Sequence, residues 1–233
     1  PYVYAVDGRT GKTVATLTLR GIGTPRDVEA VSMGPGNEIY LGDIGDNFGG
    51  KWPYVWIYKL PEPKVLKDQT IRATQYVVKY ADGPRDAESL LVHPKTGRVY
   101  IIDKKEDGGH LYEGPAKLAT SGANIFKPIA PVDLWATDAA FSPDGDRLAV
   151  RGYFGGISYA WNGGGGQGEG RAGRAARARR GARRRRGRNP GRAHGRRPRG
   201  RGHGDRPLDS TPAATRRSLC RARADALLDD RIG

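Results

Sequence analysis

Aromatic residues are absent from residues 162–233, whereas residues 1–161 contain all 19 aromatic side chains of the chain. Lysine and valine are absent from 162–233 as well, and only five large aliphatic side chains occur there. So few apolar groups bury too little surface to offset the entropy that is lost when a backbone becomes ordered. The sequence therefore predicts a disordered, low-complexity tail over 162–233 and confines any folded domain to 1–161.

Cysteine is nearly absent too, since Cys220 is the only one in the chain. One cysteine excludes an intramolecular disulfide and a cysteine-based metal site. No run of 18 apolar residues occurs, which predicts that no helix spans a membrane. A signal peptide is not recognisable, but the chain begins with Pro1 inside a strand pattern, so we expect a secreted or extracytoplasmic protein whose signal has been removed or left out.

Net charge is absent from residues 1–161, which have 19 basic and 19 acidic side chains. Residues 162–233 have 21 arginines and 6 acidic residues, so the formal net charge of +15 belongs to this segment. Such a segment attracts nucleic acids and other polyanions without sequence preference, and salt weakens the attraction. Because it has no aromatic side chain to stack on bases, we expect only non-specific nucleic-acid binding.

The arginine-rich composition also suggests how the segment arose. Residues 1–161 use 11 lysines and 8 arginines, whereas 162–233 use arginine alone, together with glycine, alanine and proline. GC-rich DNA that is read in a shifted frame encodes this composition. We hypothesise that a frameshift near residues 162–170 truncates the domain, which the nucleotide sequence can test.

Within residues 1–161 a spaced pattern recurs three times. Each copy consists of a short apolar run, a turn of proline, glycine and polar residues, and a second apolar run, which predicts a β-hairpin. The copies begin at Asp27, Asp86 and Thr137, and their turn prolines are Pro35, Pro94 and Pro143.

Further strand patterns follow the first two copies, at 54–60 with 75–80 and at 110–112 with 126–129. Four strands in about 40–50 residues, with no helical periodicity between them, are typical of β-propeller blades. The sequence predicts an all-β, incomplete β-propeller of about three to three and a half four-stranded blades. A β-sandwich remains open as the alternative. Because repeat folds cannot bury their terminal faces alone, we expect residues 1–161 to be a fragment of a larger domain.

Several of these strings resemble known propellers. The string Gly42-Asp-Ile-Gly-Asp-Asn47, with Val55–Tyr58 and Asp82–Leu90, resembles a family of mostly secreted actinobacterial propellers related to phytase-like and esterase-like propellers. The segment Phe141–Val150 is similar to the WD40-like repeat of TolB-type periplasmic propellers. The resemblance covers 1–161 and implies a propeller fold and an extracytoplasmic location.

Acidic residues take equivalent positions in the first two copies. Because the innermost strands of a propeller face its central channel, we expect the acidic side chains at the starts of these strands to converge there. They are Asp27, Glu29, Asp86 and Glu88. Carboxylate and amide oxygens suit Ca²⁺, and the phytase-like resemblance implies the same ion. The alternative is that they accept hydrogen bonds from backbone amides in tight turns. The predicted metal ligands are Asp27, Glu29, Asp43, Asp46, Asn47, Asp86, Glu88 and Asp103.

Three basic residues, Arg26, Arg85 and Lys104, are predicted contacts for an anionic ligand such as a phosphate or ester, which the resemblance implies. Nucleophilic catalysis lacks support, because there is no Gly-x-Ser-x-Gly string. We therefore expect a non-enzymatic module that binds an unknown ligand or protein partner. A Ca²⁺-dependent phytase-like or esterase-like hydrolase is the alternative, and polyanion binding through the tail is a third.

Aromatic residues concentrate at 52–58, where Trp56 and Tyr58 alternate with Val55 and Ile57. This alternation is typical of a strand with both faces covered. We interpret these aromatic residues as packing between blades rather than as a platform for a ligand.

Overall fold

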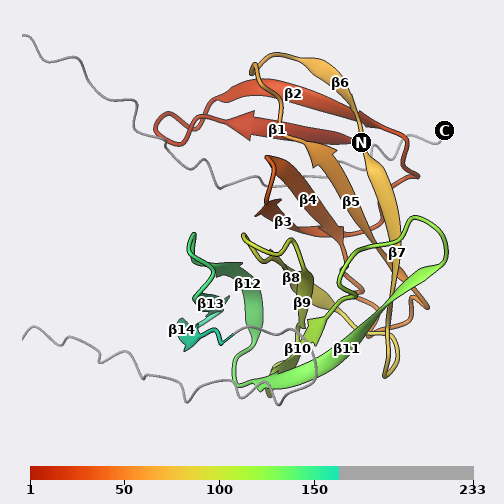
Figure 1. Cartoon of the computed structure of the whole chain (residues 1–233), viewed down its shortest axis with the longest axis vertical. Coiled ribbons are helices and arrows are strands. Elements are labelled where there is room, and N and C mark those ends of the chain that lie inside the picture. The colour runs from red at the N-terminus through yellow and green to blue at the C-terminus, as the bar shows by residue number, and fades with distance from the viewer. Residues whose placement is uncertain (163–233) are drawn as a thin grey trace, which may run out of the picture. The chain divides into compact units, whose positions relative to one another are not determined.

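The computed structural model describes residues 1–162, in which all regular secondary structure is β-strand (Figure 1). This part of the chain contains fourteen strands and no helix, so the predicted all-β class is confirmed for it. Accordingly, no helix suited to crossing a membrane is found among these residues. Apart from Asn162, the predicted tail lies outside the described residues.

The first sheet has three strands: β1 (Tyr2–Val6), β2 (Thr13–Arg20) and β6 (Gln69–Arg72). β1 and β2 form an antiparallel hairpin. In its turn, Asp7 Oδ1 accepts hydrogen bonds from the amides of Arg9 and Thr10. β6 runs parallel to the second half of β2, so the sheet joins segments about fifty residues apart in the chain.

The largest sheet has eight strands and consists of two antiparallel four-stranded units. The first unit contains β3 (Val28–Gly34), β4 (Glu38–Asp43), β5 (Val55–Pro61) and β7 (Thr74–Tyr80). The second unit contains β8 (Ala87–Val92), β9 (Val99–Asp103), β10 (Gly109–Glu113) and β11 (Ala123–Val132). The two units coincide with the first two copies of the sequence repeat and the strands predicted after each copy.

Parallel pairing joins the outermost strands of neighbouring units, which the sequence pattern did not predict. The first four residues of β11 pair with β7, and its remaining residues pair antiparallel with β10. The outer strand of the first unit is divided in the same way, since β6 pairs with β2 and β7 pairs with β5. Each outer strand therefore begins along the preceding unit and ends in its own.

The innermost strands of successive units also lie side by side. The amide of Val92 in β8 donates a hydrogen bond of 3.1 Å to Ser32 Oγ in β3. The two edges of the eight-stranded sheet therefore approach each other, and the sheet is nearly closed. The third sheet consists of β12 (Ala136–Phe141), β13 (Arg147–Gly152) and β14 (Gly155–Ala160), and β12 packs beside β8.

Three apolar cores fill the spaces between these layers. One lies between the first sheet and the first unit, one between the two units, and one between the second unit and the third sheet. Their buried members include, in that order, Leu17 and Tyr58, Ile101 and Phe126, and Tyr100 and Leu148. Every layer thus contacts its neighbour along the chain through a separate core.

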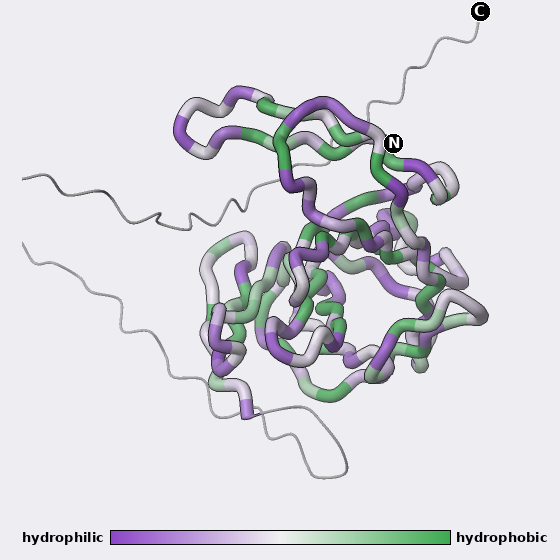
Figure 2. Tube along the Cα trace, turned by 45° about the horizontal axis from the view of Figure 1, so that its top comes forward, coloured by the Kyte–Doolittle hydropathy of each residue, from purple (hydrophilic) through white to green (hydrophobic). Residues whose placement is uncertain are grey.

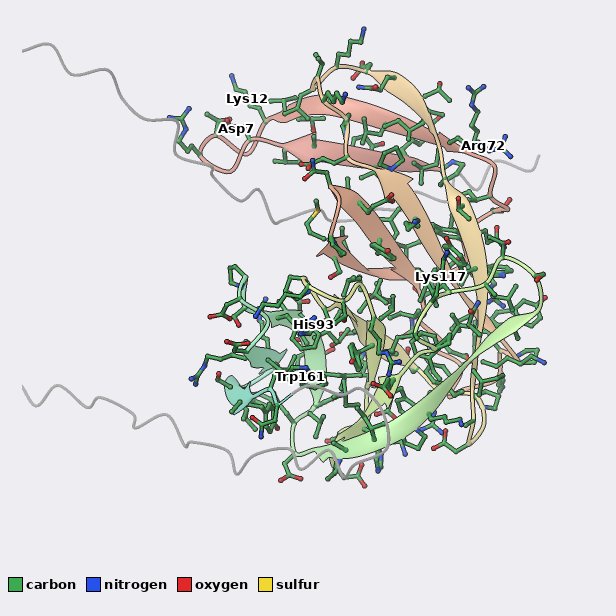
Figure 3. All side chains as sticks on the ribbon, in the orientation of Figure 1. Asp7, Lys12, Arg72, His93, Lys117 and Trp161 are labelled. Atoms are coloured by element: carbon green, nitrogen blue, oxygen red, sulfur yellow. The ribbon has the colours of Figure 1, made fainter. Side chains whose placement is uncertain are left out.

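The strand period of two residues explains why one face of the third sheet is covered and the other is open. On β13, Leu148 and Val150 are buried, whereas Arg147, Ala149 and Arg151 are exposed. Figure 2 shows hydrophobic and hydrophilic residues following one another along the strands. The covered face is completed by an aromatic group. Trp161, labelled in Figure 3, packs edge-on against Tyr100 and Phe141, with ring centroids 5.1 and 5.0 Å apart.

The same substitution should have different effects on stability at a buried and at an exposed position. Ile101 is fully buried between the two units, whereas Ile125 on β11 is 44% exposed. Ile101→Val should lower the free energy of unfolding by about 0.5 to 1.5 kcal/mol, because it leaves a small cavity in a packed core. Ile125→Val should change it by less than about 0.5 kcal/mol. Urea unfolding compares the two variants, and equal effects would contradict the packing described here.

Candidate functional site

Polar side chains gather at the starts of the innermost strands β3 and β8. We call this group the carboxylate cluster; its members are Asp27, Glu29, Asn47, Asp86, Glu88 and Lys104. Asn47 Nδ2 donates a hydrogen bond of 2.7 Å to Asp27 Oδ2. Lys104 forms an ion pair with Glu88, and Glu29 interacts electrostatically with Asp27 and Glu88. The cluster therefore combines residues from both four-stranded units.

A buried carboxylate holds the start of each innermost strand in place. Asp43, at the end of β4, accepts hydrogen bonds from the amides of Arg26 and Asp27 and from the hydroxyl of Tyr58. It is only 1% exposed. The amide hydrogen bonds fix the backbone just before β3, which places Asp27 and Glu29 in the cluster.

The second unit uses the equivalent residue, Asp103 at the end of β9. Asp103 is fully buried and accepts hydrogen bonds from the amide of His110 and from the guanidinium of Arg85, the latter at 2.9 Å. The amide of Lys104 donates to the carbonyl oxygen of Asp86. These contacts hold the segment that leads into β8. A buried carboxylate therefore also positions Asp86 and Glu88, but through the side chain of Arg85 rather than through backbone amides.

The loop after β4 adds a third support. The amide of Asp46 donates a hydrogen bond of 2.7 Å to Asp86 Oδ1, and Asp46 Oδ2 accepts one of 2.6 Å from the amide of Trp52. A Cβ atom at Gly45 would lie 2.4 Å from Asp27 Oδ2, so only glycine allows the loop to approach the cluster this closely. The Gly-Asp-Ile-Gly-Asp-Asn string is thus the segment that joins the two units at the site.

Electrostatic crowding alters the protonation of Glu29. Partial burial, together with the charge and hydrogen bond of Asp27 and the charge of Glu88, raises the pKa of Glu29 from its ordinary 4.5 to about 7. Burial lowers the pKa of Lys104, but the hydrogen bond and charge of Glu88 outweigh it and raise that pKa above its usual value. One lysine therefore does not neutralise the carboxylates around it.

The eight predicted metal ligands fall into two sets. Asp27, Glu29, Asn47, Asp86 and Glu88 are brought together in the carboxylate cluster. Asp43, Asp46 and Asp103 are buried and accept hydrogen bonds from the backbone, as the turn alternative describes. Within residues 1–162, no group of three or more acidic, histidine or cysteine side chains has the arrangement of a metal site. The role of these residues as Ca²⁺ ligands stays a prediction.

The three predicted anion contacts all have partners within the chain. Arg26 lies over the rings of Trp56 and Trp52, with its guanidinium carbon 3.9 and 4.4 Å from their centroids. Arg85 forms ion pairs with Asp82 and Asp103, and Lys104 pairs with Glu88. Their contact with an anionic ligand stays a prediction, and an anion would have to compete with these partners.

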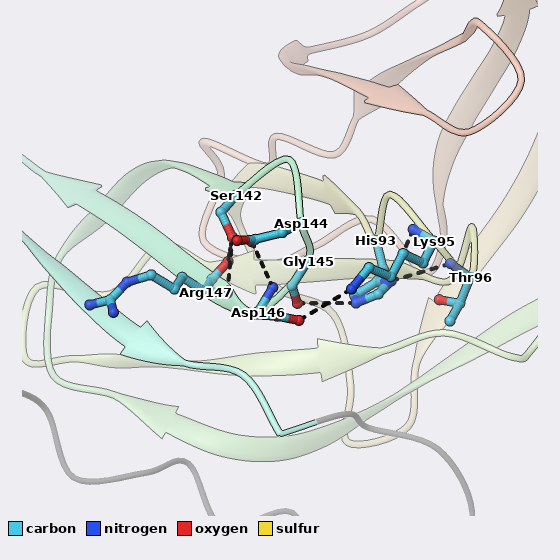
Figure 4. Close-up of polar contacts among 8 residues, drawn as sticks. All are labelled: His93, Lys95, Thr96, Ser142, Asp144, Gly145, Asp146 and Arg147. Atoms are coloured by element: carbon cyan, nitrogen blue, oxygen red, sulfur yellow. Dashed lines mark hydrogen bonds and ion pairs between the residues drawn. The ribbon is translucent and has the colours of Figure 1, made fainter.

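Histidine has a structural role at His93, which links the β8–β9 turn to the β12–β13 turn (Figure 4). Its Nδ1 accepts hydrogen bonds from the amides of Lys95 and Thr96. Because Nδ1 is an acceptor, the hydrogen of a neutral ring is on Nε2, which donates to the carbonyl oxygen of Gly145 at 3.3 Å. Neither nitrogen is therefore available as a catalytic base.

The aromatic residues at 52–58 divide by position. Tyr58 is fully buried and Trp56 packs against the first core, in agreement with the packing interpretation. Tyr54, however, is 39% exposed. The neighbouring Phe48 is 68% exposed and makes an edge contact with Trp52, so part of this aromatic group faces solvent.

Sequence reasoning missed a second exposed aromatic group in the turn between β13 and β14. Tyr153 is 53% and Phe154 is 90% exposed, although hairpin turns favour small polar residues. Tyr153 packs against Trp135 with ring centroids 4.5 Å apart, and its ring centroid lies 6.0 Å from Lys104 Nζ. Two adjacent aromatic residues in a glycine-flanked turn are the signal that could have identified the group.

Comparison of the chain with protein-family models and with curated proteins finds no match. The carboxylate cluster is therefore interpreted from its own geometry and charge.

The buried carboxylates predict a large loss of stability. Asp103→Asn removes the charge opposite Arg85, whose side chain is only 11% exposed. The free energy of unfolding should fall by about 3 kcal/mol, because the guanidinium loses its buried counter-charge. It keeps only the ion pair with Asp82, whose side chain is 43% exposed. The matched control is Asp146→Asn, which removes an ion pair with Lys95 whose side chains are 69% and 62% exposed. Urea unfolding should show a change below about 1 kcal/mol for this control.

Glu29 predicts a defined dependence of stability on pH. Its pKa is raised in the folded protein, so its contribution to stability is present below pH 4.5 and is lost as pH rises through about 7. Glu29→Gln removes this loss, and its stability relative to the wild type should increase between pH 4.5 and 7. Urea unfolding at pH 4.5, 6 and 8 measures the difference. Glu38→Gln, at a residue paired with Lys59, serves as control; a pH-independent difference for Glu29→Gln would contradict the prediction.

Proposed function

We propose that residues 1–161 form a non-enzymatic ligand-binding module of the β-propeller type, and that the carboxylate cluster binds a cationic ligand. The observation that carries the proposal is the convergence of Asp27 and Glu29 from one unit with Glu88 from the next. The propeller assignment is supported by the two repeated four-stranded units and by the lateral packing of β3, β8 and β12. In propellers the innermost strands surround the ligand-binding channel.

A cation is favoured because the cluster is short of positive charge. Asp27, Glu29, Asp86 and Glu88 are accompanied by one cation, Lys104, which pairs with Glu88. The raised pKa of Glu29 reports the unfavourable free energy of ionising one more carboxyl group there. A bound cation removes part of this cost, so ligand binding and deprotonation of Glu29 should favour each other.

Binding without catalysis is favoured because the candidate catalytic and anion-binding side chains have partners within the described residues. Both ring nitrogens of His93 have backbone partners. Arg26, Arg85 and Lys104 contact aromatic rings or carboxylates of the chain itself. His93 and the three predicted anion contacts therefore all have partners within residues 1–162.

Calcium is the second candidate ligand, and one observation favours it. Asp46 is 1% exposed, its amide contacts Asp86, and its Oδ1 has no hydrogen-bond partner. A buried carboxylate oxygen without a partner is unfavourable, and Ca²⁺ binds such oxygens. A Ca²⁺-bound cluster is also the form in which a phytase-like activity, implied by the sequence resemblance, would operate.

The proposal predicts stabilisation by cations. The full chain is titrated at pH 8 with CaCl2 and, separately, with tetramethylammonium chloride, and Tm is measured by circular dichroism. At ten times the Kd, a bound cation should add about 1.4 kcal/mol to the free energy of unfolding. Sodium chloride at equal ionic strength corrects for screening. The arginine-rich segment repels both cations and so does not bind them itself.

Matched variants locate the effect. Replacing Glu29 and Glu88 together by glutamine should abolish the response, whereas Glu38→Gln should keep it. A response to CaCl2 alone, accompanied by turnover of aryl phosphates, would replace the binding module by the phosphoesterase alternative. If neither cation raises Tm, or if the double variant responds like the wild type, the proposed function is wrong.

A further inference from the structure

We infer that the cationic ligand is an organic ammonium group and that exposed aromatic rings on two loops bind its alkyl substituents. The rings belong to Phe48, Tyr153 and Phe154, which we call the aromatic rim. This inference rests on the proposed function and adds the chemical class of the ligand and the residues that select it.

The first support is the unusual exposure of these rings. Phe48, Tyr153 and Phe154 are 68%, 53% and 90% exposed. Adjacent exposed aromatic rings, such as Tyr153 and Phe154, are typical of interaction surfaces, and loop tips normally have small polar residues. None of the three belongs to an apolar core of residues 1–162. Their ring contacts with the rest of the fold are those of Phe48 with Trp52 and of Tyr153 with Trp135, which leave most of each residue exposed.

The second support is that the loops of these rings adjoin two different members of the carboxylate cluster. Phe48 directly follows Asn47, whose side chain donates to Asp27. On the other side, the ring centroid of Tyr153 lies 6.0 Å from Lys104 Nζ, and Lys104 pairs with Glu88. The two loops belong to different sheets, yet each adjoins a member of the cluster, one at Asn47 and the other at Lys104.

The combination of rings and carboxylates specifies the ligand class. Aromatic faces attract ammonium groups through their quadrupole and attract alkyl groups through apolar contact. An inorganic ion has no alkyl groups that could pack against the rings. A purely apolar partner would remove the carboxylates from water without providing an opposite charge. A methylated or alkylated ammonium group satisfies both parts of the surface. Lys104 already shows that an ammonium group is placed beside Glu88 and Tyr153.

The ammonium group has two possible sources, a free small molecule and a lysine side chain of a peptide. The test therefore uses tetramethylammonium chloride and a short acetylated, amidated peptide containing one trimethyl-lysine between glycines. Isothermal titration calorimetry of the full chain at pH 8 measures the Kd of each probe. Equal affinities indicate recognition of the ammonium group alone, and tighter peptide binding indicates a peptide partner.

Single substitutions of the rim by alanine test the role of the rings. Phe154→Ala and Phe48→Ala should each raise the Kd of tetramethylammonium about three- to tenfold. Both residues are exposed, so the variants should fold normally, which the unchanged circular dichroism spectrum verifies. Val65→Ala is the matched control, because Val65 is 63% exposed on the β5–β6 connection and should leave the Kd unchanged.

The results separate the two proposals. Tetramethylammonium binding that depends on Glu29 and Glu88 but not on either phenylalanine overturns the aromatic rim and leaves the proposed function intact. Stabilisation by CaCl2 with no binding of tetramethylammonium also overturns the rim. Absence of any cation response overturns the proposed function as well. Loss of tetramethylammonium affinity in the phenylalanine variants, with the CaCl2 response retained, establishes the rim.

Discussion

The hydrogen bonds of two buried carboxylates, Asp43 and Asp103, are the constraint on which the candidate site depends. Each lies at the end of the second strand of a four-stranded unit and accepts hydrogen bonds that fix the neighbouring backbone and side chains. A buried carboxylate is stable only when donors surround it, so strand ends and donors must take defined positions. The acidic side chains that follow Arg26 and Arg85 are therefore held close together, despite their mutual repulsion.

This repulsion connects the fold to the proposed function. Four acidic side chains, Asp27, Glu29, Asp86 and Glu88, surround one lysine, and their repulsion destabilises the fold. Packing in the cores and pairing of the parallel outer strands offset this cost in free energy. Burial, together with the charges of Asp27 and Glu88, raises the pKa of Glu29, so part of this cost remains within the chain. Binding sites commonly show such uncompensated charge, because the missing counter-charge belongs to the ligand. In our proposal, exposed rings on the adjoining loops favour a cation that has alkyl substituents.

Much of the fold was predictable from local patterns, but the assembly of the units was not. Alternating apolar residues and turn residues predicted the hairpins of both units, because these features act over a few residues. The pairing of β7 with β11 joins segments about forty-five residues apart, and no local pattern encodes it. The same limit applied to the site: spacing identified the acidic positions, but it did not separate buried Asp43 and Asp103 from the partly buried acids beside Glu29.

The sequence alone determined the boundary between residues 1–161 and the arginine-rich segment, the all-β class, and the equivalent positions of acidic residues in successive repeats. These properties follow from composition and from the two-residue period of a strand, which involve only neighbouring positions. Tertiary structure alone decided which carboxylates share one site, that Arg26 and Arg85 are occupied by internal partners, and that Phe48 and Phe154 remain exposed. Burial and electrostatic repulsion depend on distances between distant parts of the chain, and only folding sets those distances.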